Sequence, residues 1–276
     1  MTRTRTTMLA VGAVTAVTAA VLVPGAAGAA TAKGIPVVKV NLGTSTSLSR
    51  THLRPGRVTF EVHSRADHTL QIASLHKGYT LADANKDINA GFGGDAAAIR
   101  RADKNVNFKG GSEARKGHPS RVTVYLSAGT YLAVNFDNGA SKAFTVSGAA
   151  VNRKTVATNS RITMLTYGFD SPSRIHRQGV MRLSNRSDQP HFLVMQHVRR
   201  NTTYAQVKKA FANMSGPQPK FVLKSGTDSG VLSNTKTQAF SYRLPAGRYV
   251  IACFWPDDET GMEHAAMGMF KIITLY

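Results

Sequence analysis

Short stretches in which apolar and polar residues alternate recur along the chain. Residues 58–62, 122–126 and 240–244 each alternate in this way, with β-branched or aromatic residues among the apolar positions. A period of two predicts strands that bury one face. Residues 127–136 and 245–254 instead place a turn before a continuous apolar run, which is typical of a central strand. The pattern therefore predicts a chain built mostly from β-strands.

Two positions carry the signature of a helix start. Thr80 stands three residues before Asp83, and Thr203 stands three residues before Gln206. A hydroxyl side chain followed at this spacing by an acid or amide caps the N-terminus of a helix. We therefore predict one short helix after each threonine. Residues 85–120 are rich in glycine and polar side chains, and this composition favours a long loop.

The body of the chain repeats its own pattern. Residues 56–72 align without a gap with residues 179–195, and two further matches follow in the same order. Repeats of this kind mark repeated structural units, so we predict two domains in tandem. The domains comprise residues 33–155 and 156–276, and each is expected to be an antiparallel β-sandwich with a short helix.

The N-terminal residues have the pattern of an export signal. Arg3 and Arg5 precede an uncharged apolar run at residues 8–23, and small residues with A-x-A spacing follow at 27–32. This order is typical of a secretory signal peptide, here residues 1–32. An uncleaved N-terminal anchor is the alternative. No later run is long enough to span a membrane, so we predict a secreted protein in the extracellular, cell-wall environment of a bacterium.

The chain is strongly basic, with 35 Lys and Arg against 15 Asp and Glu and a formal net charge of +20. The basic residues occur as short scattered pairs, and the sequence carries no nucleic-acid-binding motif, so we do not expect nucleic acid as a partner. For a secreted protein this charge predicts non-specific, salt-sensitive binding to anionic cell-wall polymers. A solvated surface without a specific partner is the alternative.

Cys253 is the only cysteine, which excludes an intramolecular disulfide and a multi-cysteine zinc module. The segment after Cys253 is longer than the matching segment after Asn135 in the first repeat. A thiol, two imidazoles and a thioether are the ligand types of a mononuclear copper centre. An inert core thiol is the alternative interpretation of Cys253. The second repeat supplies the other candidate ligands, which are His191, His264, Met267 and Met269.

The second repeat resembles the cupredoxins, and its C-terminal pattern is similar to those of plastocyanin and rusticyanin. The segment H-A-A-M-G-M-F-K-I places four residues between His264 and Met269 and then leads into a predicted strand. The resemblance implies a Greek-key β-sandwich that binds copper, with Met267 as the second choice for the axial ligand. The implied ligands are His191, Cys253 and His264 in the equatorial positions and Met269 as the weak axial ligand.

Two features depart from the cupredoxin pattern. Ten residues, 254–263, separate Cys253 from His264, whereas cupredoxins have few residues there. Spacing alone therefore does not return the imidazole to the thiol. In the first repeat Asn135 takes the place of the cysteine, and no histidine follows it in the short loop. A blue-copper site needs the thiolate, so the first domain is predicted to bind no metal.

These observations lead to a preferred function and an alternative. The resemblance implies a secreted, non-enzymatic blue-copper electron carrier or copper-binding protein, with a redox protein as its partner. The alternative is a metal-free extracellular binding module that uses the loop at 254–263, with Cys253 as a core residue. An oxidase or nitrite-reductase-like enzyme is disfavoured, because the chain has no His-x-His pair and no histidine next to Cys253.

Overall fold

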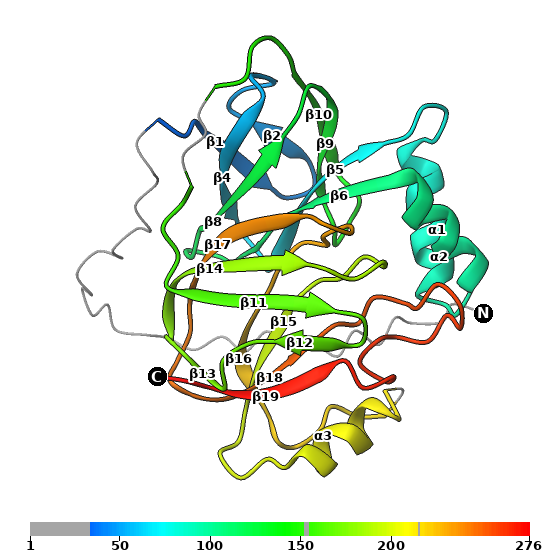
Figure 1. Ribbon diagram of the computed structural model, residues 1–276, viewed down its shortest axis with the longest axis vertical. Coiled ribbons are helices and arrows are strands. Elements are labelled where there is room, and N and C mark those ends of the chain that lie inside the picture. Colours follow the sequence, from blue (N-terminus) through cyan, green and yellow to red (C-terminus); the bar gives the residue numbers. More distant parts are fainter. Residues whose placement is uncertain (1–33, 152–154, 215) are drawn as a thin grey trace.

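The computed structural model describes residues 34–151, 155–214 and 216–276, which form nineteen strands and three helices (Figure 1). The predicted signal peptide, residues 1–32, lies outside the described residues. The N-terminal half contains β1 (Val37–Leu42), β2 (Thr46–Leu48), β3 (His52–Leu53), β4 (Gly56–Ser64), β5 (His68–Leu75), α1 (Leu81–Gly91), α2 (Ala96–Asn105), β6 (Val106–Gly110), β7 (Glu113–Ala114), β8 (Ser120–Leu126), β9 (Gly129–Asn135) and β10 (Ser141–Val146). The C-terminal half contains β11 (Ser160–Leu165), β12 (Gly168–Asp170), β13 (Arg174–Ile175), β14 (Gln178–Asn185), β15 (Val194–Val198), α3 (Tyr204–Phe211), β16 (Val222–Asp228), β17 (Thr237–Arg243), β18 (Gly247–Ala252) and β19 (Phe270–Leu275).

Over the described residues the strands form three sheets, and the largest contains strands from both halves. Its eight strands follow the order β12-β11-β14-β17-β8-β4-β1-β2. At its centre β17 and β8 run antiparallel, with Phe240 opposite Val122. The two smaller sheets follow the orders β3-β10-β9-β5-β6, with β7 beside β5, and β13-β19-β18-β15-β16. The fold is therefore mostly β, as the alternating pattern predicts.

The two halves pair their strands in the same way. The antiparallel pairs β4–β8, β5–β9 and β9–β10 in the first half correspond to β14–β17, β15–β18 and β18–β19 in the second. Among the strands that the structure describes, four pairs are parallel, namely β1–β4, β11–β14, β3–β10 and β13–β19. The prediction of purely antiparallel sheets is wrong at these pairs, because alternation identifies a strand but not the direction of its neighbour.

A single apolar cluster extends across both halves and reaches the candidate site. Val58, Phe60 and Val62 alternate along β4 and are fully buried, as the period of two predicts. They belong to the same cluster of buried residues as Cys253 and Trp255. The thiol therefore lies in the interior of the protein, at the end of a strand that is buried along much of its length.

Both predicted helix starts are confirmed. Thr80 accepts a hydrogen bond from the backbone N–H of Asp83 at the start of α1, and Thr203 accepts one from Gln206 at the start of α3. In each case the acid or amide side chain accepts in return from the backbone N–H of the threonine. These reciprocal bonds satisfy N–H groups that a helix leaves unpaired at its N-terminus.

The predicted loop over residues 85–120 is wrong, because α1, α2, β6 and β7 occupy most of it. Asp95 caps α2 through the backbone N–H of Ala98, and Ala98, Ile99 and Ala102 bury one face of the helix. Small residues of this segment therefore form most of the buried face of a helix. The described part of the N-terminal half consequently has two helices, which lie against each other away from α3 (Figure 1).

No helix among the described residues is both long enough and apolar enough to cross a membrane.

Candidate metal centre

The candidate ligands come from the ends of two neighbouring strands and from the segment before the last strand. His191 precedes β15 and Cys253 follows β18, and these strands pair antiparallel with Val194 opposite Ala252. The backbone of His191 is fixed by reciprocal hydrogen bonds with Leu232. This pairing brings the first imidazole and the thiol to the same end of the sheet, although their positions in the sequence are far apart.

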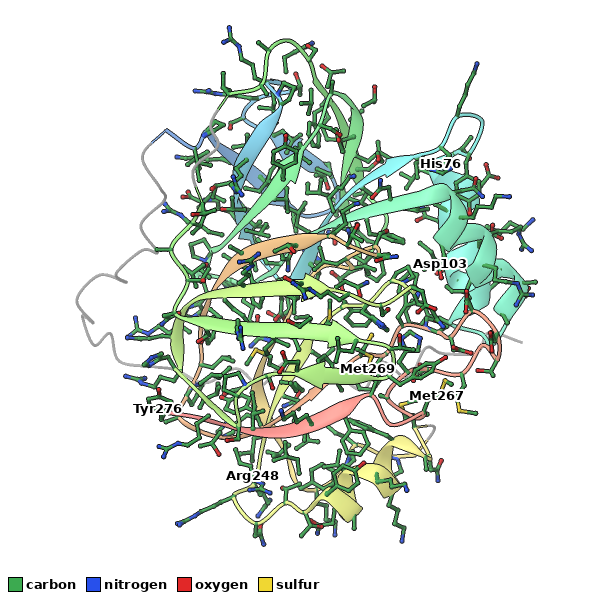
Figure 2. The ribbon with its side chains drawn as sticks, in the orientation of Figure 1. His76, Asp103, Arg248, Met267, Met269 and Tyr276 are labelled. Atoms are coloured by element: carbon green, nitrogen blue, oxygen red, sulfur yellow. The ribbon has the colours of Figure 1, made fainter. Side chains whose placement is uncertain are left out.

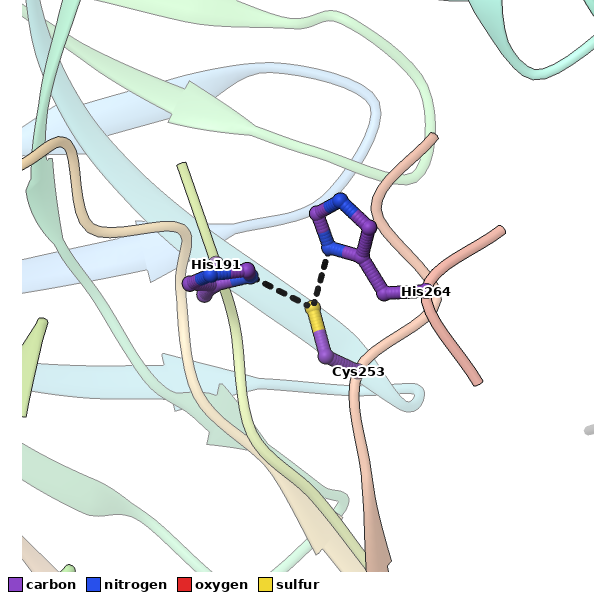
Figure 3. Close-up of side chains that lie close together, drawn as sticks. All are labelled: His191, Cys253 and His264. Atoms are coloured by element: carbon purple, nitrogen blue, oxygen red, sulfur yellow. Dashed lines mark hydrogen bonds between the residues drawn. The ribbon is translucent and has the colours of Figure 1, made fainter. Parts of the chain in front are cut away.

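His191, Cys253 and His264 converge on one point (Figure 3). The Cys253 sulfur lies 3.5 Å from Nδ1 of His191 and 3.7 Å from Nδ1 of His264. One ligand atom from each residue can be chosen so that all three lie within 4.8 Å of one another. All three side chains are buried, with at most 1% of any residue exposed. Two nitrogens and a sulfur in a shielded cluster form the donor set that suits copper.

The two methionine candidates occupy different environments on the segment before β19, where both are labelled in Figure 2. Met269 is fully buried. Its carbonyl accepts from the backbone N–H of Cys253 at 3.2 Å, and its own N–H donates to the carbonyl of His264 at 2.8 Å. The backbone thus holds Met269 beside two of the converging residues, and its axial role stays a prediction. The sulfur of Met267 instead lies 3.9 Å from the Thr260 hydroxyl, which donates its proton to Asp257.

Ser187 hydrogen-bonds to Nε2 of His191, whereas Nδ1 of the same ring faces Cys253. The Ser187 hydroxyl donates to the carbonyl of Gln189 at 2.9 Å, which uses its only proton. The same oxygen lies 2.7 Å from Nε2 of His191. With its proton on that carbonyl, the Ser187 oxygen accepts from Nε2 of His191, and in this arrangement the ring carries its proton on Nε2. This leaves Nδ1, the atom that faces Cys253, with a free lone pair, as a metal ligand requires.

A second network fixes His264 in the same tautomer. The Gln189 amide nitrogen donates to the Asp257 carboxylate at 3.0 Å, and the Gln189 amide oxygen lies 2.9 Å from Nε2 of His264. An amide oxygen only accepts, so Nε2 of His264 carries the proton and its Nδ1 faces the thiol with a lone pair. Tyr167 donates to the same carboxylate at 2.6 Å.

Burial sets the protonation of all three groups. Burial, aided by His264, holds the pKa of His191 well below its usual range. Burial also lowers the pKa of His264 to about 4, against the opposing effect of the Asp257 and Asp188 carboxylates. Burial raises the pKa of the Cys253 thiol to about 12. At neutral pH the metal-free centre thus holds two neutral imidazoles and a protonated thiol, and a bound metal would displace the thiol proton.

The loop at 254–263 folds back through Asp257. One oxygen of Asp257 accepts from the backbone N–H and the hydroxyl of Thr260, both at 2.7 Å. The backbone of Asp257 bonds to Met262 and Gly261, and the N–H of His264 donates to the carbonyl of Trp255 at 3.0 Å. These bonds turn the ten intervening residues into a closed hairpin-like loop, which returns His264 to Cys253.

Sequence reasoning missed the residues that orient the imidazoles. Ser187 and Gln189 lie just before His191, and Tyr167 lies between β11 and β12. Only Ser187 carries a signal in the sequence, because the repeat aligns it with Ser64 as it aligns His191 with His68.

The matching position in the N-terminal half is built differently. His68 keeps its serine partner, with its Nδ1 3.0 Å from the Ser64 hydroxyl. Asn135, in the place of Cys253, is fully buried, and its amide donates to the carbonyl of Gly43 at 3.1 Å. Its side-chain oxygen accepts from the backbone of Asp137. The side-chain amide of Asn135 therefore hydrogen-bonds to backbone groups at the position that corresponds to Cys253.

Trp255, two residues after Cys253, packs against the N-terminal half. Its ring is fully buried and packs edge-on against Phe108 and Phe92, with ring centroids 5.2 and 5.9 Å away. Its indole N–H and both carboxyl oxygens of Asp103 on α2 are buried without a hydrogen-bond partner among the described residues. Figure 2 labels Asp103 on the helical side of the molecule. Burial and the Asp258 charge raise the pKa of Asp103 to about 8, and the nearby indole N–H of Trp255 lowers it.

No protein-family model and no curated protein matches this chain. Several solved structures are similar to parts of it. A reduced auracyanin from Roseiflexus castenholzii is 18% identical, with 44% of this chain and 98% of that chain covered and a TM-score of 0.28. The blue copper protein auracyanin A from Chloroflexus aurantiacus is 15% identical, with 42% and 98% covered and a TM-score of 0.26. A copper-containing nitrite reductase from Thermus scotoductus is 9% identical, with 87% and 61% covered and a TM-score of 0.24.

These likenesses are slight. A buried His–Cys–His cluster lies at adjoining strand ends of a mostly β chain, with a methionine directly before the last strand. This arrangement is cupredoxin-like.

Proposed function

We propose that this chain binds one copper ion through His191, Cys253 and His264, with Met269 as the weak axial ligand, and transfers single electrons. The observation that carries the proposal is the convergence of two imidazole nitrogens on one thiol sulfur inside the core. Nδ1 of each ring directs its lone pair toward the thiol. Both rings are neutral in the metal-free protein at neutral pH. The donor set is therefore formed before the ion arrives.

The surrounding residues suit electron transfer. Bound copper would supply the one-electron chemistry between its two common oxidation states. Ser187 and Gln189 hold the two rings in place, and the apolar cluster around Cys253 keeps water away. A centre whose side chains are fixed by packing and hydrogen bonds changes little in geometry when its charge changes. A small change in geometry favours rapid electron exchange with a partner protein.

We propose in addition that the chain consists of two related domains, residues 33–155 and 156–276, of which only the second binds copper. The shared order of strand pairs in the two halves supports this division. The backbone-bonded amide of Asn135 in place of the thiol supports a metal-free first domain. The first domain then contributes Phe108 and Phe92 as packing surfaces for Trp255.

The proposed setting is extracellular, in the cell-wall environment of a bacterium. The export pattern of residues 1–32 supports secretion, and the net charge of +20 supports weak, salt-sensitive association with anionic wall polymers. A redox protein is the expected partner for a centre that exchanges single electrons.

Copper titration of the purified protein tests the proposal. We expect one copper ion per chain and an intense visible absorption band, both lost in Cys253→Ser. His68→Ala is the matched control, because His68 is the counterpart of His191 in the half without the thiol, and it should leave the band unchanged. A colourless copper-loaded protein would reject the electron carrier and favour the binding module. Oxygen and nitrite reduction are assayed on the same sample, and turnover of either would identify an enzyme.

A further inference from the structure

Gln189 links the candidate centre to the long loop that follows Cys253. Its amide oxygen faces Nε2 of His264 at 2.9 Å, and its amide nitrogen faces the Asp257 carboxylate at 3.0 Å. The backbone N–H of Asp258 donates to the same amide oxygen at 3.3 Å. Gln189 is buried, with 7% of the residue exposed. It therefore contacts the ring on one side and the loop on the other.

The direction of each hydrogen bond in this network follows from the chemistry of the groups. An ionised carboxylate only accepts, so Asp257 requires the amide nitrogen of Gln189 on its side. Hydrogen bonds from Tyr167, Gln189 and Thr260 outweigh burial and keep the pKa of Asp257 low, so the carboxylate is ionised. The amide oxygen must then face His264. The ring in turn donates from Nε2 and presents the lone pair of Nδ1 to the thiol.

The hydrogen-bond network around Gln189 orients a ring that strand pairing does not hold. His191 and Cys253 lie at the ends of paired strands, so the sheet itself places them together. His264 follows ten loop residues, and no strand pair fixes its ring. Within the described residues its Nε2 has one side-chain partner, Gln189. The orientation of this one imidazole thus depends on the loop.

We propose that Gln189 is the positioning residue for His264 and that Asp257 acts through it, so that the loop at 254–263 closes the centre by orienting one imidazole. This inference rests on the proposed copper function for its consequence, but its first readout does not require copper. A buried ring donor that loses its acceptor is destabilised, and loss of such an outer partner weakens metal binding by about 10–100-fold.

Two variants separate the orienting role from simple packing. Gln189→Leu fills a similar volume without hydrogen bonds. The double variant Gln189→Glu with Asp257→Asn reverses the donor and acceptor between the two side chains. It still offers an oxygen to Nε2 of His264. The double variant should therefore restore what Gln189→Leu loses. Gln196→Leu is a control, because the Gln196 amide bonds to backbone carbonyls, those of His197 and Ser225 among them, and not to the cluster.

The first measurement is the imidazole nitrogen NMR spectrum of the metal-free protein. We expect one tautomer of His264, protonated at Nε2, in the unaltered protein, the control and the double variant. Gln189→Leu should give a mixture of tautomers, and circular dichroism should show that its fold is kept. A single Nε2–H tautomer in folded Gln189→Leu would overturn the proposal. If that variant does not fold, the double variant decides alone, and loss of its single tautomer would overturn the proposal.

The second measurement is copper affinity by competition with a chelator. Gln189→Leu should bind copper about 10–100-fold more weakly, and the double variant should recover most of that loss. Unchanged affinity in Gln189→Leu would contradict the positioning role. If no version of the chain binds copper but the tautomer still changes, the copper function fails and the orienting role of Gln189 stands.

Discussion

Replacement of Asp103 by asparagine should change how the stability of the metal-free protein depends on pH. Both carboxyl oxygens of Asp103 are buried beside the Trp255 indole, and burial with the Asp258 charge raises the carboxyl pKa to about 8 against the lowering effect of Trp255. In the unfolded chain the pKa of this carboxyl returns to its ordinary value near 3.8. Between these two pKa values the folded state holds a proton that the unfolded state has released.

The sign of the effect follows from proton linkage. Stability rises with pH only where the unfolded state binds more protons, and here the folded state binds more. Asp103 therefore lowers the free energy of unfolding as the pH rises from about 4 to about 8. One proton difference corresponds to about 1.4 kcal/mol per pH unit. The loss between pH 5 and pH 7 is consequently about 3 kcal/mol.

Urea unfolding at several pH values, with copper removed by a chelator, measures this effect. We expect the free energy of unfolding of Asp103→Asn to exceed that of the unaltered protein by an amount that grows by about 3 kcal/mol from pH 5 to pH 7. Asparagine has nearly the same shape and carries no charge at any pH, so the comparison isolates the carboxyl. Asp170→Asn, at an exposed position on β12, should show no such growth. Parallel stability curves for Asp103→Asn and the unaltered protein would refute the reasoning.

Three further substitutions test other parts of the structure. Thr203→Ala removes the capping hydroxyl of α3 and should lower the free energy of unfolding by about 1 kcal/mol, measured by urea unfolding; an unchanged midpoint would contradict the capping role. Asn135→Cys places a thiol in the N-terminal half, but no second imidazole follows it there. Elemental analysis should therefore still give one copper ion per chain. A value of two would contradict the prediction that this half binds no metal. Asp257→Ala leaves the Tyr167, Gln189 and Thr260 donors without their acceptor. It should lower the free energy of unfolding by about 2–4 kcal/mol and speed proteolysis within the loop at 254–263. An unchanged rate of proteolysis would show that the loop does not depend on Asp257.

Much of the architecture is predictable because its signals are local. The alternation in β4 reports which residues face the core, and the spacing of Thr203 to Gln206 reports a cap that depends on the same few residues. The helix α2 was not predictable from composition, because its buried face consists mainly of alanines, which the glycine-rich surroundings obscure. The parallel pairs, such as β1–β4, depend on how the chain crosses between distant strands, and no local pattern records this.

In the candidate metal centre, too, some residues are indicated by local sequence patterns and others are not. Cys253 and His264 are visible in the sequence as a lone thiol followed by an imidazole and a methionine before a strand. The side chains that orient the rings are not visible in this way. Gln189 is a common polar residue in a loop, and its role appears only when the fold places it between His264 and Asp257.

The contact between β8 and β17 makes the two halves dependent on each other. This antiparallel pair joins the strands of both halves into one continuous sheet (Figure 1). If residues 156–276 were produced alone, β17 would expose unpaired N–H and C=O groups, which invite edge-to-edge association with other copies. The N-terminal half therefore acts as a built-in edge cover. Pairing with β8 satisfies these backbone groups of β17 within the same chain.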